Sequence, residues 1–499
     1  MKYVIGVDLG TSAVKILLVD QLGNVVQEVS KSYPLIQEKT GYNEQDPQVW
    51  IDQTAAGLSD LLKEADVNAS EVEGISFSGQ MHGLVLLDEN YNVLRPAILW
   101  NDTRTTEQCQ NIYRQVGEEK LLELTKNPAL EGFTLPKLLW VKENEPEIYE
   151  RASTFVLPKD YLRYKMTGKL HMEYSDAAGT LLLNIGEKQW SKEICETVGI
   201  SAELCPPLVA SDAEVGTIAE NFAERTGMNP STRVFAGGAD NACGAIGSGI
   251  LEDGKTLCSI GTSGVVLSYE QGPEKNFQGK VHYFNHGAKN AYYTMGVTLS
   301  AGHSLSWFKE VFAPDIDFDD LLAEVGSVPV GANGLLFTPY LVGERTPHAD
   351  STIRGSFIGM DSSHRRDDFV RAVMEGITFS LNESIDIFRQ NGKQIDTIVS
   401  IGGGAKNEAW LQMQADIFDA TIVKLASEQG PGMGAAMLAA FGCGWFDSLA
   451  ACADQFLQEA ATYQPNPENV ERYRELFQLY KTVYRQTADI NHKLMRYRK

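Results

Sequence analysis

Short apolar runs alternate with longer amphipathic stretches along the whole chain. Val4–Val7 and Ile395–Ile401 are two of these runs, and residues with helical spacing separate such runs from one another. Regular alternation of strand-like and helix-like segments predicts an α/β fold class. No Pro/Ser-rich linker divides the chain, so the division into domains has to come from other signals.

A long amphipathic helix is predicted near the C-terminus, where large apolar side chains recur every three or four residues. They are Val470, Tyr473, Phe477, Tyr480 and Tyr484. We expect this helix to pack against the body of the protein or against a second subunit, which makes a homodimer a hypothesis to test. The helix carries no side chains with recognisable catalytic chemistry.

The tripeptide Gly-Thr-Ser occurs at residues 10–12 and again at 261–263, in the two halves of the chain. Each copy lies between two short β-rich runs, so each is expected at the tip of a β-hairpin. Turn chemistry explains a single copy. Two copies favour a polyphosphate held between two similar halves by backbone N–H groups and hydroxyls. A Walker loop is excluded, because no helix follows and the GK[ST] ending is missing.

Two glycine clusters lie where predicted strands lead into predicted helices. Residues 237–241 read Gly-Gly-Ala-Asp-Asn, and Gly402, Gly403 and Gly404 precede a helix with Trp410, Met413 and Ile417 on one face. In α/β folds, phosphates and nucleotides bind at such helix N-termini, where N–H groups are unpaired. Tight packing without a ligand is the alternative.

Three carboxylates are candidates because of their positions. Asp8 ends the first strand, Asp240 opens a glycine-rich helix start, and Asp102 lies in a polar run after Trp100. A helix cap is the plain interpretation of such an aspartate. Between two phosphate-binding halves, it can instead accept the proton of a hydroxyl group. Asp8 would repel phosphates unless a cation such as Mg²⁺, held partly through water, lay between them.

A run of polar and sulfur-containing side chains at residues 78–83 reads Ser-Gly-Gln-Met-His-Gly and predicts the floor of a binding pocket. Metal ligation by His82 is disfavoured, because no second His or Cys lies nearby. The polar run at residues 343–348, Gly-Glu-Arg-Thr-Pro-His, is interpreted as a structural ion-pair corner.

Composition narrows the functional classes. The formal net charge is −23, so the surface repels nucleic acid and anionic lipid. Seven cysteines without a C-x-x-C pair argue against a disulfide framework and a zinc cluster. The N-terminus lacks the features of a signal peptide, and the longest small and apolar stretch, 430–446, is shorter than a membrane span. We therefore expect a cytoplasmic protein with no membrane partner.

Six motifs resemble those of the FGGY carbohydrate kinases in order and spacing, across essentially the whole chain. They are DLGTS, WNDTR, GGADNACGA, SIGTSG, GERTPH and IGGGAKN. The resemblance implies a duplicated actin-like, ribonuclease-H-like ATPase fold with two domains around a catalytic cleft. It also implies an N-terminal sugar-side domain, a C-terminal nucleotide-side domain and C-terminal helices, at residues 1–247, 248–445 and 446–499.

The resemblance also implies roles for individual residues. Asp240 is expected to accept the proton and Asp8 to act beside the phosphates and Mg²⁺, through water, while Met81, His82 and Asn241 contact the sugar. The expected nucleotide-binding residues are Thr11, Ser12, Gly261, Thr262, Ser263, Gly402, Gly403, Gly404 and Asn407. One departure is Ala239, where relatives often have glycine; its methyl group could alter the approach of the substrate.

Within the family, SGQMHG followed by LRPAILWNDTR is similar to the kinases that act on xylulose. Glycerol kinases instead carry an Arg-Glu pair near Gln80–His82. The implied activity is ATP-dependent phosphorylation of D-xylulose at its 5-hydroxyl, as in D-xylose catabolism. Two alternatives stay open: a kinase for another ketose or polyol, such as ribulose or arabitol, and an actin-like ATPase without a sugar substrate.

Overall fold

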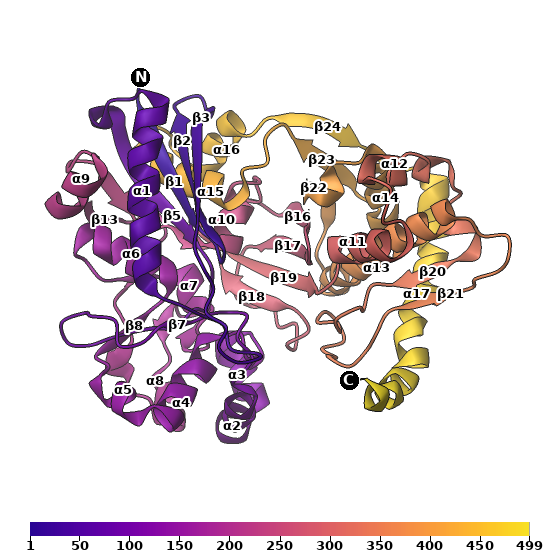
Figure 1. Ribbon diagram of the computed structural model, residues 1–499, viewed down its shortest axis with the longest axis horizontal. Helices are drawn as coiled ribbons and strands as arrows, with labels where there is room; N and C mark the ends of the chain where they lie inside the picture. The colour runs from indigo at the N-terminus through magenta and orange to yellow at the C-terminus, as the bar shows by residue number, and fades with distance from the viewer. Residues whose placement is uncertain (499) are drawn as a thin grey trace.

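Two mixed β-sheets form the centre of the structure, a computed structural model that describes residues 1–498 (Figure 1). The first sheet has the order β13-β14-β5-β1-β2-β3 and contains β1 (Tyr3–Leu9), β2 (Ala13–Asp20), β3 (Val25–Ser32), β5 (Val72–Gly79), β13 (Glu214–Thr217) and β14 (Arg233–Phe235), with β15 (Gly238–Ala239) beside β5. The second has the order β18-β19-β17-β16-β22-β23-β24 and contains β16 (Gly254–Ile260), β17 (Gly264–Glu270), β18 (His282–Asn285), β19 (Tyr292–Thr298), β22 (Ile395–Gly402), β23 (Thr421–Leu425) and β24 (Glu459–Tyr463).

The two sheets repeat one pattern of strand directions. In the first, β1 and β3 are antiparallel to β2, β1 is parallel to β5, β5 is parallel to β14, and β14 is antiparallel to β13. In the second, the same sequence of directions runs through β19, β17, β16, β22, β23 and β24. The fold is therefore a duplication, as the repeated Gly-Thr-Ser predicts.

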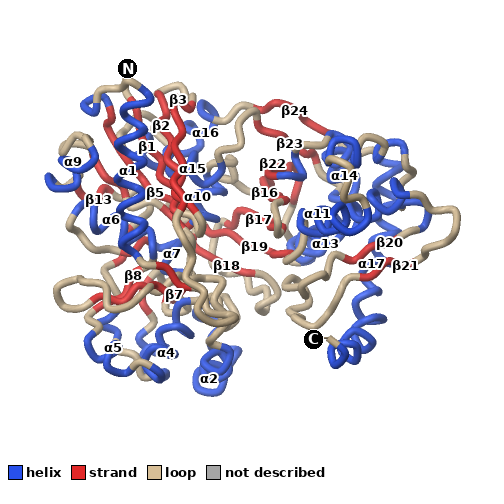
Figure 2. Tube along the Cα trace, viewed as in Figure 1, coloured by secondary structure: helices blue, strands red, loops and turns tan. Residues whose placement is uncertain are grey.

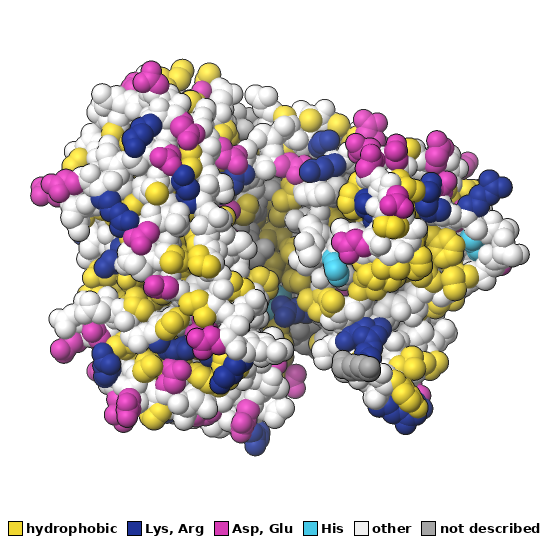
Figure 3. All heavy atoms as spheres, in the orientation of Figure 1, with side chains coloured by type: hydrophobic (Ala, Val, Ile, Leu, Met, Phe, Trp, Pro, Cys, Tyr) yellow, Lys and Arg dark blue, Asp and Glu magenta, His cyan; other side chains and the backbone are white. Residues whose placement is uncertain are grey.

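Both Gly-Thr-Ser segments lie at the tips of β-hairpins, which confirms that prediction. Leu9 pairs with Val14 in the first hairpin, and Ile260 pairs with Gly264 in the second. Each tip thus lies at the end of a central strand of its sheet. The space-filling view shows a hollow between the two halves of the protein (Figure 3).

Helices cover both sheets, and the strand-to-helix alternation confirms the α/β class (Figure 2). Among them are α1 (Pro47–Ala65), α11 (Gly302–Phe312), α13 (Arg366–Gln390), α14 (Glu408–Phe418), α15 (Gly430–Gly442) and α17 (Pro467–Leu494). The predicted C-terminal helix is α17, whose aromatic face packs against α13 and α14. Tyr473 donates its hydroxyl to Glu375 of α13 at 2.8 Å. This face is therefore occupied within the chain.

The small and apolar stretch near residue 430 forms a buried helix, α15, that packs on the first sheet although it lies between β23 and β24 of the second sheet in sequence. Gly6 of β1 contacts the backbone of α15 at Gly432, where a side chain on Gly6 would collide. The helix also packs against α10 (Asp240–Ile246), and α16 (Leu449–Phe456) packs beside it. One helix therefore supports both β1, which carries Asp8, and α10, which begins with Asp240.

The remaining strands and helices complete the two halves. In the first half they are β4 (Glu44–Gln45), β6 (Val85–Leu87), β7 (Ala97–Ile98), α2 (Thr106–Val116), α3 (Glu118–Thr125), α4 (Thr134–Asn144), α5 (Pro146–Arg151), β8 (Thr154–Val156), α6 (Pro158–Thr167), β9 (Met172–Glu173), α7 (Tyr174–Ala178), β10 (Leu183–Asn184), β11 (Gln189–Trp190), α8 (Lys192–Val198), β12 (Leu208–Val209) and α9 (Glu220–Thr226). In the second they are α12 (Phe318–Leu322), β20 (Leu336–Thr338) and β21 (Ser356–Ile358). Among the described residues, none of the helices has the length and apolarity needed to cross a bilayer.

Candidate active site

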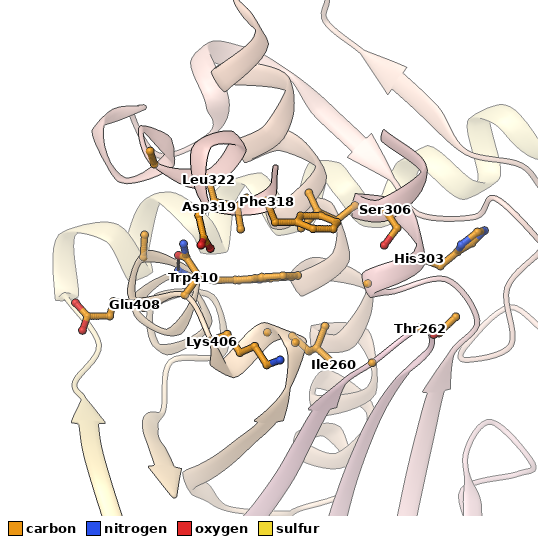
Figure 4. A pocket seen from close by; sticks show the side chains of 18 of the residues that line it. Ile260, Thr262, His303, Ser306, Phe318, Asp319, Leu322, Lys406, Glu408 and Trp410 are labelled. Carbon is orange, nitrogen blue, oxygen red and sulfur yellow. Dashed lines mark hydrogen bonds between the residues drawn. The ribbon is translucent and has the colours of Figure 1, made fainter. Parts of the chain in front are cut away.

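A cavity of about 890 Å³ lies in the second half, between the tip of the second hairpin and helices α11, α12 and α14 (Figure 4). Five of the residues predicted to bind a nucleotide line it: Gly261, Thr262, Gly403, Gly404 and Asn407. They follow the ends of β16 and β22. These two strands are distant in sequence but adjacent in the sheet, where they pair in parallel.

The turn after β22 requires glycine at residue 402. Gly402 has φ of 81°, and a Cβ there would lie 2.7 Å from the carbonyl oxygen of Ile260. Only glycine adopts this conformation without strain so close to a neighbouring strand. Gly402 does not line the cavity itself; it sets the path of the turn that does. Asn407 then caps α14 by accepting a hydrogen bond from the Trp410 amide at 3.0 Å.

The sequence analysis did not predict three further residues of this cavity as contacts for a ligand. Phe318 and Trp410 both line it, with the Phe318 ring above the Trp410 ring in this view, and Lys406 brings a cation (Figure 4). Phe318 is partly exposed, at 40 % of its surface, as suits a wall that contacts a planar ligand. Aromatic residues of a helix face usually signal a core. Periodicity alone therefore gave no reason to assign Trp410 to a ligand site.

Both hairpin tips present free backbone donors. Among residues 1–498, the amide N–H groups of Thr11, Ser12, Thr262 and Ser263 donate no hydrogen bond. The carbonyl oxygens of the second tip are occupied, because the N-terminus of α11 donates to Gly261 at 2.8 Å. Unpaired N–H groups at exposed turns form a favourable place for an anion. Thr11 and Ser12 line neither cavity, and Ser263 lines the second one described next.

A second cavity, of about 340 Å³, contains the predicted sugar-binding residues and the predicted base. Met81, His82, Asp240 and Asn241 all line it. The side-chain amide nitrogen of Asn241 donates to the Asp240 carboxylate at 3.0 Å and also lies 3.6 Å from the Met81 sulfur. Residues of the second half complete the wall, so both halves of the protein form this cavity.

His82 occupies a tight turn that directs its ring into this cavity. Its φ is 68°, and its carbonyl oxygen accepts hydrogen bonds from Lys137 at 3.0 Å and Thr134 at 3.1 Å. The ring lies 4.5 Å from that of Phe133, and its Nδ1 lies 2.6 Å from the Gly179 carbonyl oxygen. Burial, followed by the charge of Lys137, lowers the pKa of His82 to about 3. The imidazole is therefore neutral.

Asp240 and Asp8 lie close enough for their charges to interact. Burial raises the pKa of Asp240 to about 7, and the Asp8 carboxylate adds to the rise. Burial also raises the pKa of Asp8. Such a pair attracts either a proton or a cation. No group of three or more potential metal ligands occurs among the described residues, so any cation here would also need oxygen atoms from water or substrate.

Asp102, the third candidate carboxylate, has a structural role. It is 1 % exposed, and the Arg104 guanidinium donates to both of its oxygens, at 2.9 and 2.7 Å. The amide of Asn43 donates to it as well, at 2.7 Å. A carboxylate held in this way is an acceptor already in use. Asp102 lies at the wall of the second cavity without a free oxygen for a proton.

The expected effect of Ala239 on the substrate is not supported. Ala239 is fully buried, has φ of −56°, and does not line either cavity. Its methyl group fits an ordinary extended conformation and packs into the protein, away from the ligand space.

The segment 343–348 has two roles, one of which the sequence analysis missed. Glu344 is structural: it is 2 % exposed and accepts hydrogen bonds from Leu299 and Ser380. Arg345, in contrast, lines the second cavity, and within residues 1–498 its guanidinium makes no hydrogen bond or ion pair. Its neighbours in the cavity include His282, another residue absent from the predicted set. Arg345 is the one arginine in this wall.

Both halves of the chain match the same protein family. Residues 3–247 match the N-terminal domain of the FGGY family of carbohydrate kinases, and residues 256–443 match its C-terminal domain. The chain belongs to the FGGY family of carbohydrate kinases. The duplicated fold is thus the actin-like fold that the motifs indicated. The exact boundaries at 247 and 445 stay a prediction.

Three similar proteins illustrate the range within the family. A xylulose kinase of Bacillus subtilis is 62 % identical over 499 residues, which cover all of both chains. The solved structure of a xylulose kinase from Lactobacillus acidophilus superposes with a TM-score of 0.94 at 30 % identity, covering 99 % of this chain and 100 % of the other. A gluconate kinase from the same organism gives the same TM-score and identity, covering 99 % of each chain. The chain is a sugar kinase, and the fold is shared by kinases of different sugars.

Proposed function

We propose that this kinase transfers the γ-phosphoryl group of ATP to the 5-hydroxyl of D-xylulose, giving D-xylulose 5-phosphate and ADP. The observation that carries the proposal is the second cavity, which brings Asp240 together with His82, Met81 and Asn241. The 62 % identity to a xylulose kinase over the whole chain supports the choice of sugar.

The two cavities suit the two substrates. The nucleotide occupies the larger one, with its base near Phe318 and Trp410 and its phosphates toward the second hairpin tip. Ser263 belongs to the wall of the sugar cavity, so that tip lies between the nucleotide and the sugar. Thr11 and Ser12 of the first tip then face the phosphates from the other half. Donors from both halves would stabilise the charge that the phosphoryl group carries during transfer.

Asp240 orients the sugar hydroxyl and takes its proton. Phosphoryl transfer commonly has a loose transition state, so positioning and charge stabilisation contribute more than deprotonation of the nucleophile. His82, as a neutral imidazole, and Asn241 hold the sugar through hydrogen bonds. Closure of the two halves would exclude water from the phosphoryl group and limit hydrolysis of ATP.

Mg²⁺ fits the pair formed by Asp8 and Asp240. Burial raises the pKa of both carboxyl groups, and the charge of Lys15 offsets only part of the rise at Asp8, so a cation bound beside them would be favourable. Oxygen ligands from carboxylate, water and phosphate are those that Mg²⁺ prefers. When bound, the ion would neutralise phosphate charge. Asp8 would hold it, through water, while Asp240 stays ionised as the proton acceptor.

The remaining expectations on partners are part of the proposal. The charge of −23 makes nucleic acid and anionic membranes poor partners, in keeping with a cytoplasmic enzyme. A homodimer stays a hypothesis, and the buried aromatic face of α17 lends it no support. Light scattering after size-exclusion chromatography measures the mass directly.

A screen of ADP release tests the choice of substrate. The enzyme is assayed with D-xylulose, ribulose, arabitol, gluconate and no sugar, at fixed ATP and Mg²⁺. We expect turnover to depend on the sugar and kcat/KM to be highest for D-xylulose. A rate without sugar that equals every other rate would favour the ATPase alternative. A clear preference for another compound would overturn only the assignment of the sugar.

Gluconate is included for a structural reason. The Arg345 guanidinium lies in the sugar cavity without an acceptor among the described residues, and a carboxylate is a strong acceptor for it. A sugar acid is therefore the second candidate substrate.

A further inference from the structure

A group of buried ionisable side chains lies behind the catalytic turn and takes no part in the proposed chemistry. Lys159, Asp160, Arg163, Glu173 and Asp176 are all fully buried. The Lys159 ammonium lies 2.9 Å from Asp160, 3.2 Å from Asp176 and 3.6 Å from Glu173. Burial raises the pKa of Asp176 well above its ordinary value, and two basic side chains face three acidic ones in this cluster. Buried charges persist only when they are paired.

One hydrogen-bond chain runs from this cluster to the residue before Asp240. The Ser175 hydroxyl donates to the Glu173 carboxylate at 2.8 Å and accepts from the Ala239 amide at 2.9 Å. Asp240 follows directly and begins α10 without a capping side chain from Ala239. The Ser175 hydroxyl thus holds the amide of the residue directly before the proposed base, in addition to the pairing of β15 with β5.

Two further contacts hold the same turn farther upstream. The Arg163 guanidinium donates to the carbonyl oxygen of Ala236 at 2.7 Å. The amide of Gly237 donates to the carbonyl oxygen of Ser211 at 2.9 Å, and the Ser211 hydroxyl donates to Glu173 at 2.9 Å. Three separate links therefore connect the turn to one buried cluster, and Ser175 makes the link closest to Asp240.

The short helix α7 also contacts the sugar side. Ser175 lies in its first turn, and Gly179 follows its last residue. The carbonyl oxygen of Gly179 lies 2.6 Å from Nδ1 of His82. The start of α7 therefore contacts the residue before the base through the Ser175 hydroxyl. Its end contacts the sugar-binding residue His82 through the Gly179 carbonyl oxygen.

We propose that Ser175 is a positioning residue for phosphoryl transfer, which acts by holding the Ala239 peptide and thereby the carboxylate of Asp240. The inference rests on the proposed role of Asp240. Because His82 is held by the Gly179 carbonyl and not by the Ser175 hydroxyl, loss of that hydroxyl affects the chemical step and leaves sugar binding in place.

The test compares Ser175→Ala with Ser76→Ala. Both replace a fully buried serine, but the Ser76 hydroxyl has no hydrogen-bond partner among residues 1–498. For Ser175→Ala we expect kcat to fall roughly ten- to a hundredfold, with KM for sugar and for ATP within about twofold of wild type. Ser76→Ala should keep kcat. Both variants should melt within about 4 °C of each other.

Hydrogen exchange in the substrate-free protein gives a second readout that needs no turnover. In Ser175→Ala, the peptide covering residues 234–246 should exchange faster, and the peptide covering 395–402 should not change. Unchanged exchange at 234–246, or faster exchange with wild-type kcat, would overturn the proposal. So would a loss of kcat accompanied by equal increases in KM and a large drop in melting temperature, which would indicate a merely structural role. Absence of sugar-dependent turnover in the wild type would instead refute the proposed function, and the exchange result would still decide whether Ser175 holds the turn.

Discussion

The ring of His82 donates a hydrogen bond from Nδ1 to the carbonyl oxygen of Gly179, at 2.6 Å. A carbonyl oxygen can only accept, so Nδ1 carries the proton of the neutral imidazole. Nε2 therefore has a free lone pair and accepts a hydrogen bond. A sugar hydroxyl is a suitable donor, and this relationship defines what His82 contributes to the second cavity.

We predict that His82→Ala raises KM for D-xylulose and leaves KM for ATP nearly unchanged. Loss of a hydrogen bond to a neutral group is worth about 1 kcal/mol, and an unsatisfied partner costs about 1–3 kcal/mol, so kcat/KM should fall roughly five- to a hundredfold. Steady-state kinetics with each substrate varied separately measure this. His364→Ala, outside both cavities, is the control. An unchanged response to xylulose would mean that His82 does not contact the sugar.

The lowered pKa of His82 makes a second prediction, on pH. The folded-state value of about 3 lies below the ordinary 6.5, so the ring is neutral in the folded protein throughout the range from about pH 5.5 to about pH 8. Asp240 titrates near pH 7 in the same cavity, so the test uses Asp240→Asn, and we expect xylulose to bind this variant with constant affinity over that range. The contribution of His82 to folding stability is lost as the pH falls below 6.5 toward the lowered value, because the unfolded chain then binds the proton more readily. A loss of xylulose affinity in Asp240→Asn with a midpoint near 6.5 would contradict a neutral, buried imidazole.

We predict that Asp240→Asn retains ATP binding and lowers kcat by on the order of a hundredfold or more, since the amide keeps the shape but accepts no proton. Calorimetric titration with ATP and a turnover assay separate the two effects. Asp46→Asn is a matched control, because Asp46 caps α1 by accepting from the Gln48 amide at 2.9 Å. If Asp240→Asn kept half of the wild-type kcat, Asp240 would be a helix residue without a catalytic role.

Features set by local sequence could be predicted. Each Gly-Thr-Ser lies between two β-rich runs, so its hairpin depends on residues within about ten positions. The place of Asp240 at the start of a helix is likewise predicted by the strand and glycine-rich turn directly before it. The aromatic face of α17 is likewise a local signal. Its partner was not predictable, because the choice between the body and a second subunit depends on where α13 and α14 lie.

Features set by long-range packing were missed. Arg345 reaches the sugar cavity from a segment that follows His82 by more than half of the chain, and nothing in its neighbouring residues indicates that side of the cleft. Asp102 was a candidate proton acceptor, and its structural role depends on the amide of Asn43, 59 residues earlier in the chain, which donates to it together with Arg104. In both cases the role of the side chain depends on its contacts in the folded protein, and spacing along the chain does not reveal those contacts.

We predict that Arg345→Gln raises KM for the sugar by roughly tenfold, since a guanidinium without a protein partner donates to ligand oxygens in the cavity. Arg354→Gln is the control, because Arg354 belongs to the same loop but lies outside this cavity. If gluconate is a substrate, Arg345→Gln should reduce its kcat/KM more than that of a neutral sugar. Equal kinetics for the two variants would show that Arg345 does not contact the substrate.

Two explanations of the role of Asp8 predict different responses of kcat to Mg²⁺. At about 4 Å from a phosphate oxygen, an unscreened carboxylate would be repelled by several kcal/mol at an effective dielectric near 20, and a bridging cation turns this repulsion into attraction. We therefore predict that Asp8→Asn has low activity that rises with Mg²⁺ well beyond the concentration that saturates the wild type. If Asp8 only stabilises the hairpin turn, the amide replaces it almost without loss. A Mg²⁺ titration of kcat for both proteins, with melting temperatures to confirm folding, distinguishes them. Superimposable curves with equal maximal rates would mean that Asp8 has no role in metal binding. ATP and water would then hold the cation, and Asp240 would be the only carboxylate of the Asp8–Asp240 pair beside it.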